Sequence, residues 1–98
     1  MSEIQISDVS HRQKITNDNL ARATNIVHLA LGRAMQKKGK GAWLSRHEIL
    51  GIIVEEGQKE VVDAVHGGSL SELQDELIDL AVGCIFGIAC ITQKTLDW

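Results

Sequence analysis

The chain has 98 residues and a formal net charge of −3, and 44% of its residues are apolar although only three are aromatic. This length suits one domain, and the mild acidity argues against a general nucleic-acid binder, which carries a basic face. Because so short a chain buries only part of its apolar surface, we expect several helices that complete their core against a second copy of the chain.

The absence of proline removes the strongest helix breaker and favours an all-α fold. Residues 1–15 are polar and weakly periodic, so we expect an N-terminal arm or tail there and a helical domain over residues 16–98. A first helix is expected to begin near Thr16 or Asn17, which are good N-cap residues. It should end in the lysine- and glycine-rich stretch at residues 37–41.

Two capping boxes of the form Ser-x-x-Glu, at residues 45–48 and 69–72, predict the starts of two more helices. The second helix should run to about His66 and stop at the following glycine pair. The third should run to about Thr92, and its second half is apolar nearly all round, so it must be covered on several sides. The sequence therefore predicts a short bundle of about three main helices.

Both later helices carry lines of carboxylates at spacing i, i+4 and i+7, which places each line within roughly 60° of arc on one helix face. Asp79 lies in the most apolar helix, which has no basic residue before Lys94. An unpaired buried charge is costly, and a divalent cation would pair with it. Mg²⁺ prefers such hard oxygen ligands, with Mn²⁺ as the alternative. The two lines are Glu56, Glu60, Asp63 and Glu72, Glu76, Asp79.

The individual acids are expected to differ in role. Glu72 belongs to a capping box, Glu55 projects away from the acidic line, and Asp75 is expected at the surface. Asp63 is a less favoured ligand. The remaining four are the predicted metal ligands and catalytic carboxylates: Glu56, Glu60, Glu76 and Asp79.

The segments EEGQKEVVDAV, at residues 55–65, and LQDELIDL, at residues 73–80, resemble the MazG-like all-α nucleoside triphosphate pyrophosphohydrolases. That superfamily carries Glu-Glu-x-x-Glu on one helix and Glu-x-x-Asp on the next. The resemblance spans residues 45–91 and implies a helical bundle that forms a homodimer or homotetramer and whose carboxylates bind Mg²⁺. It also implies cleavage of a nucleotide between its α- and β-phosphates.

The chain departs from the family pattern at one position. In the register that keeps the spacing between the two motifs, Glu56 and Glu60 are the outer acids and Gly57 replaces the middle one. The family uses that middle acid as a ligand, so Glu56, Asp63 or water would have to take its place. A catalytically impaired protein of the same fold is therefore the alternative reading.

The loop after the first helix offers candidate substrate-binding residues. Lys37 and Lys40 could meet phosphate and Trp43 could stack on a base, although a tryptophan there could equally plug the end of the bundle. Cys84 and Cys90 match neither a redox motif nor a zinc site, so we expect buried free thiols in the reducing cytoplasm. The longest apolar stretch, residues 80–91, is too short to span a membrane.

These observations predict a cytoplasmic, Mg²⁺-dependent enzyme that hydrolyses a nucleoside or deoxynucleoside triphosphate to the monophosphate and pyrophosphate. The resemblance implies a role in house-cleaning or in control of nucleotide pools. Nothing in the sequence favours the related phosphoribosyl-ATP pyrophosphatase activity. The rival reading is a non-catalytic helical assembly protein in which the apolar third helix serves oligomerisation alone. Neither a nucleic-acid partner nor a membrane partner is expected.

Overall fold

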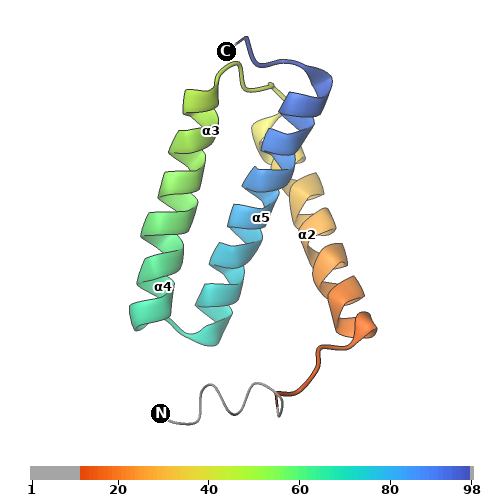
Figure 1. The fold of residues 1–98 in the computed structure, drawn as a ribbon, viewed down its shortest axis with the longest axis vertical. Coiled ribbons are helices and arrows are strands. Elements are labelled where there is room, and N and C mark those ends of the chain that lie inside the picture. Colours follow the sequence, from red (N-terminus) through yellow and green to blue (C-terminus); the bar gives the residue numbers. More distant parts are fainter. Residues whose placement is uncertain (1–11, 98) are drawn as a thin grey trace.

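The computed structural model describes residues 12–97, which form helices and their connections without any strand (Figure 1). The all-α prediction is thus confirmed for this part of the chain. Helix α2 spans Asn17–Lys38 and α5 spans Leu70–Gln93; between them α3, η2 and α4 follow one another without a break, over Arg46–Ile53, Val54–Val61 and Val62–Gly67. Of the predicted N-terminal arm, residues 12–15 are non-helical, and residues 1–11 lie outside the described range.

The predicted helix starts are confirmed by their caps. Thr16 accepts a hydrogen bond from the Asn19 backbone N–H at 3.1 Å, and α2 ends at Gly39, whose φ of 83° favours glycine. Ser45 and Ser69 each form a complete capping box, so α3 and α5 begin where the sequence indicates. Each box satisfies backbone N–H groups that would otherwise lack partners at the helix start.

The second predicted helix is not regular, which corrects the sequence expectation. Its central eight residues, η2, form a π-helix, in which the backbone bonds run to the fifth residue instead of the fourth. The wider turn changes the directions of side chains three and four residues apart, so the α-helical spacing rule does not hold there. The weak helix former Gly57 is the only local signal of this irregularity.

Helix α5 is the central element, because it packs against both α2 and the composite helix α3–η2–α4. Figure 1 shows α2 crossing α5 near one end and diverging from it towards the N-terminal end of α2. The composite helix approaches α5 closely at Gly83, where an added Cβ would lie 3.0 Å from Ile52 Cγ2. These two antiparallel helices form a hairpin, called here the α3–α5 hairpin.

The core of the single chain is small. Among the described residues, only Ala64, Gly87 and Cys90 are buried. Cys84 is exposed, which corrects the expectation that both thiols are buried. One chain therefore leaves α5 uncovered along much of its length. Within residues 12–97, no helix has the length and apolar character that a membrane crossing requires.

Many of the uncovered apolar residues of the hairpin lie on the side away from α2, called here the outer face, whereas Ile85 of α5 lines a hollow with residues of α2. Ile52 on α3 and Phe86 on α5 line a cavity together with residues of α2. Leu50 and Ile88 are each two residues away from them, a rotation of about 200°, so they point away from α2. The large exposed apolar residues of the outer face are Leu50, Val54, Val65, Leu77, Ile88 and Ile91.

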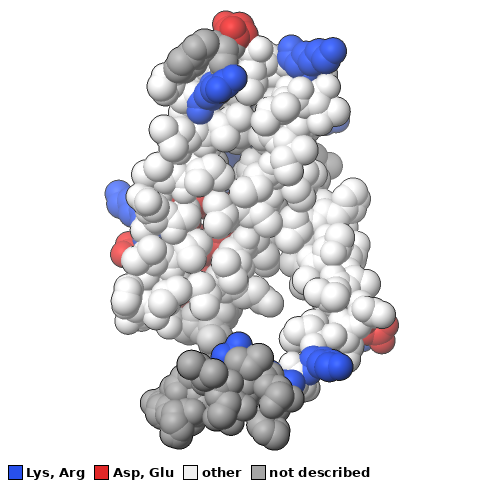
Figure 2. All heavy atoms as spheres, in the orientation of Figure 1, with Lys and Arg blue, Asp and Glu red and all other residues white. Residues whose placement is uncertain are grey.

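Figure 2 presents the hairpin in the orientation of Figure 1. The surface over α3, α4 and α5 is largely free of lysine, arginine, aspartate and glutamate, whose side chains gather mainly at the rim. Parts of acidic residues are visible between the two helices. The hairpin thus combines a largely uncharged exterior with acidic groups set between its helices.

Candidate functional site

The structure brings together the four carboxylates that the sequence singles out. Glu56 and Glu60 come from η2, and Glu76 and Asp79 come from the facing part of α5. One carboxylate oxygen from each of them lies within 4.8 Å of the corresponding oxygens of the other three. The first three side chains are partly buried and Asp79 is exposed, so the cluster lies between the helices with one edge open to solvent.

The pKa values of two carboxyl groups in this cluster, Glu56 and Glu76, are raised. Burial, followed by the negative charge of Glu60, raises the pKa of Glu56 from 4.5 to about 7. A hydrogen bond with Glu60, followed by burial, raises the pKa of Glu76. A hydrogen bond between two carboxyl groups needs a shared proton, so the cluster without a cation retains protons that isolated acids would release at neutral pH.

Two oxygens of the cluster have no hydrogen-bond partner among residues 12–97. Glu56 Oε1 and Glu76 Oε1 are both buried, and neither makes a hydrogen bond. A buried polar atom without a partner is costly, and a divalent cation would satisfy both oxygens and relieve the repulsion between the acids. Four carboxylate oxygens form a hard donor set of the kind that suits Mg²⁺. The residues present therefore fit a magnesium ion.

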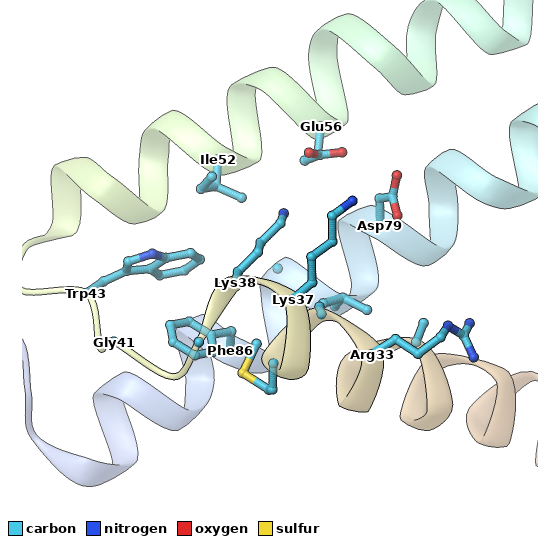
Figure 3. Close-up of a pocket in the computed structure, with 15 residues that line it drawn as sticks. Arg33, Lys37, Lys38, Gly41, Trp43, Ile52, Glu56, Asp79 and Phe86 are labelled. Carbon is cyan, nitrogen blue, oxygen red and sulfur yellow. The ribbon is translucent and has the colours of Figure 1, made fainter.

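The cluster borders a cavity of about 700 Å³ between α2 and the hairpin. Glu56 and Asp79 line its acidic side, and α2 contributes Arg33, Lys37 and Lys38. Figure 3 shows the side chains of both lysines extending from the end of α2 towards Glu56. The cavity therefore holds carboxylates suited to a cation and cationic groups suited to an anion a short distance apart.

The wall at the other end of the cavity is aromatic. Trp43, from the loop between α2 and α3, and Phe86 of α5 have ring centroids 4.8 Å apart at an interplanar angle of 70° (Figure 3). This edge-to-face arrangement is favourable for two aromatic rings. Gly87 follows Phe86 and lies beside the indole, since an added Cβ would make an ordinary contact with Trp43 Cζ3 at 3.5 Å.

Two predicted site residues lie elsewhere. Lys40 lines a separate hollow with His28 and Gln36, on the other side of the end of α2. Asp63 is exposed and lies beside Glu60 in an acidic depression near the start of α5, outside the group of four. The π-helical turn separates Asp63 from the others, because it breaks the regular spacing that would align all three acids of that helix.

The expected roles of the other acids agree with their positions. Glu72 completes its capping box by accepting a bond from the Ser69 backbone N–H at 2.7 Å, while Glu55 and Asp75 are exposed. Sequence reasoning did not assign Arg33, Lys38 or Phe86 to the cavity. Arg33 and Lys37 are spaced i, i+4, and Phe86 follows Asp79 at i+7, so a shared helix face was the available signal in both cases.

Comparison with models of known protein families, with curated proteins and with solved structures found no match to this chain.

Proposed function

We propose that this chain is a Mg²⁺-dependent pyrophosphohydrolase of the MazG-like type, which cleaves a nucleoside or deoxynucleoside triphosphate to the monophosphate and pyrophosphate. The observation that carries the proposal is the four-carboxylate cluster at the edge of a cavity that also holds three cationic side chains and an aromatic wall. A metal–triphosphate complex needs these three kinds of contact together. The proposed role is the house-cleaning or balancing of nucleotide pools in the cytoplasm.

Glu56, Glu60, Glu76 and Asp79 would hold the ion, with Glu56 Oε1 and Glu76 Oε1 gaining the partner that the protein does not supply. Bound Mg²⁺ supplies charge neutralisation for the phosphates and lowers the pKa of a coordinated water. A carboxylate oxygen of the cluster that the ion does not occupy can accept the proton of the water that attacks the α-phosphorus.

The remaining residues of the cavity bind and orient the substrate. Lys37 and Lys38 would donate hydrogen bonds to phosphate oxygens, with Arg33 available further along α2. Trp43 presents an aromatic surface on which a nucleobase can stack. Holding the two ends of the nucleotide in this way fixes the α-phosphorus near the carboxylates, and such positioning supplies a large part of catalysis in phosphoryl transfer.

The proposal includes a homo-oligomer, a dimer or a tetramer, assembled through the outer face. The exposed fractions of its six apolar side chains run from 42% for Val54 to 63% for Ile88. The exposed thiol Cys84 precedes Ile88 by four residues on α5 and so lies on the same side of that helix. Its lack of basic residues argues against a membrane surface as its partner.

The rival function is that of a non-catalytic assembly protein, favoured by the same outer face and by Gly57 in the acidic motif. The two functions differ in what the carboxylate cluster does. In the rival, the cluster binds no substrate and the outer face is the functional surface.

The test measures products from a panel of nucleoside and deoxynucleoside triphosphates, with and without Mg²⁺, by ³¹P NMR. Wild-type protein should release pyrophosphate, without orthophosphate, only when Mg²⁺ is present. A Glu76→Gln/Asp79→Asn double variant should lose this activity by at least about 100-fold, because it removes two ligands of the ion.

Glu55→Gln is the matched control, since it removes an exposed acid beside the cluster and should keep activity within about threefold. Absence of Mg²⁺-dependent pyrophosphate release from every nucleotide would favour the assembly protein. An equal loss of activity in Glu55→Gln and in the double variant would show that the reaction depends on the overall negative charge of this region and not on these four carboxylates.

A further inference from the structure

The loop that carries Trp43 is held by hydrogen bonds from two directions. On one side, the carboxylate of Glu48 accepts bonds from the backbone N–H groups of Leu44 and Ser45, as part of the cap of α3. On the other side, the segment after α5 bonds to the carbonyls of Trp43 and Leu44. The indole therefore projects from a short backbone stretch whose polar groups are held by a nearby residue, Glu48, and by a segment distant in sequence.

The segment that supplies the second set of bonds is residues 94–97, called here the C-terminal strap. Lys94 adopts a left-handed conformation with φ of 63°, which ends α5 and turns the chain back over the loop. Thr95 Oγ1 then donates to the Trp43 carbonyl at 2.8 Å, and the Asp97 backbone N–H donates to the Leu44 carbonyl at 2.8 Å. Thr95 lies 52 residues from Trp43 in sequence, so only the fold creates this contact.

Thr95 is the side chain on which this attachment depends. Asp97 acts through its backbone N–H, which any residue except proline would provide. The Thr95 hydroxyl also lies 3.4 Å from the Cys90 carbonyl, but it has one hydrogen to donate and the Trp43 carbonyl is the nearer acceptor. The site is partly buried, so loss of the hydroxyl would leave the Trp43 carbonyl short of a partner.

We propose that Thr95 is a positioning residue, whose hydroxyl holds the loop so that Trp43 lies against Phe86 as the aromatic wall of the cavity. The consequence for substrate binding rests on the proposed function, because it requires the nucleobase to stack on Trp43. Thr95 itself does not line the cavity and acts only through the tryptophan. Its removal should weaken substrate binding while leaving the carboxylates, and hence the chemical step, intact.

The test uses the full chain in a Trp98→Phe background, so that Trp43 is the only fluorophore of its kind. Thr95→Val keeps the shape and removes the hydroxyl, and Thr95→Ser keeps the hydroxyl. Thr92→Val is the matched control, because Thr92 is exposed on the last turn of α5. Acrylamide quenching of Trp43 fluorescence, near-UV circular dichroism and nucleotide KM and kcat are measured for each variant.

Thr95→Val should increase the quenching constant of Trp43 about twofold and weaken its near-UV signal. It should raise KM about five- to tenfold, the equivalent of one hydrogen bond, with kcat within about twofold. Thr95→Ser and Thr92→Val should stay within about twofold of the parent in every measurement. A chain that ends at residue 96 removes the Asp97 N–H and should shift the Trp43 signals in the same direction, which keeps the test valid if Thr95→Val does not fold.

Unchanged quenching and near-UV signals in both Thr95→Val and the shortened chain would overturn the proposal, as would an equal change in Thr92→Val. A fall in kcat with KM unchanged would also overturn it. The spectroscopic measurements need no nucleotide. If no nucleotide is hydrolysed but the Trp43 signals shift as expected, the proposed function fails and the positioning role of Thr95 stands.

Discussion

The two sides of the α3–α5 hairpin are incomplete in opposite ways. The side towards α2 contains carboxylates, two of whose buried oxygens lack a hydrogen-bond partner. The outer face, only two residues further along the same helices, exposes aliphatic side chains that have no cover. A buried oxygen without a hydrogen-bond partner is stabilised by a cation or a hydrogen-bond donor. Exposed aliphatic surface is stabilised by packing against further aliphatic surface. Each side therefore indicates the chemistry of what would complete it.

The comparison also shows why these incomplete sides can coexist in so short a chain. A helix presents different side chains every 100°, so one helix pair can carry a polar site on one side and an association surface on the other. The buried residues of the single chain are few, and the energy that keeps four carboxylates close together must come from elsewhere. Association through the outer face would supply it by burying apolar area.

The largest expected effect comes from placing a charge on the outer face. Ile88→Lys should weaken self-association by at least about 100-fold, because a lysine at the centre of an apolar interface is buried without a partner. Light scattering coupled to size-exclusion chromatography should show the mass of the assembly fall towards 10.7 kDa, the mass of one chain.

Leu29→Lys is the control for that variant. Leu29 is as exposed as the outer-face residues, at 52%, but lies on α2. It should leave the mass of the assembly unchanged. If Leu29→Lys dissociated the assembly and Ile88→Lys did not, the interface would lie on α2 and not on the outer face. If the wild-type protein were a monomer, neither surface would be an association surface.

The next prediction concerns the carboxylate cluster and the pH dependence of the protein's stability. The pKa of Glu56 is about 7 in the folded chain against 4.5 for a free glutamate, so between these values the folded state binds more protons than the unfolded state. Stability without divalent cations should therefore fall as pH rises from about 4.5 to 7 and level off above that. Thermal unfolding at a series of pH values in EDTA measures this dependence.

Mg²⁺ should reverse that loss at pH 8. At a concentration 100-fold above its Kd, it should raise the unfolding midpoint by roughly 10 °C in a domain of this size. Glu56→Gln should flatten the pH dependence and reduce the Mg²⁺ effect, while Glu55→Gln should alter neither. If stability without cations instead rose with pH between 4.5 and 7, the pKa of Glu56 would not be raised by burial and by the neighbouring carboxylates.

The smallest effect concerns the contact between the two helices of the hairpin, at Gly57 and Leu80. Gly57→Ala should raise the free energy of unfolding by about 0.5–1 kcal/mol, because alanine favours a helical backbone over the unfolded chain. The added Cβ would meet the Leu80 methyl groups at 3.9 Å, an ordinary contact. Urea unfolding measures the change, and destabilisation by more than about 1 kcal/mol would mean that the helices approach more closely at this position.

Much of the fold and part of the site could be predicted because the signals are local. The capping boxes at Ser45 and Ser69 satisfy backbone groups within four residues, so they specify helix starts without reference to the rest of the molecule. Asp79 does belong to the cluster, but the burial expected from its apolar sequence neighbours is wrong, because its side chain is exposed. Gly57 is a weak local signal of the π-helical turn, and the exposure of Cys84 has no local cause that the sequence displays.

The sequence by itself determined three helices, their caps, and the four acids that share two facing helix stretches, because helix periodicity and capping depend on residues a few positions apart. Only the tertiary structure decided that Phe86 and Arg33 border the cavity, that Lys40 and Asp63 lie outside the group, and that Thr95 reaches Trp43. These relations depend on how α2, α5 and the strap are placed against one another. Such placement follows from packing summed over the whole chain, which no short stretch of residues encodes.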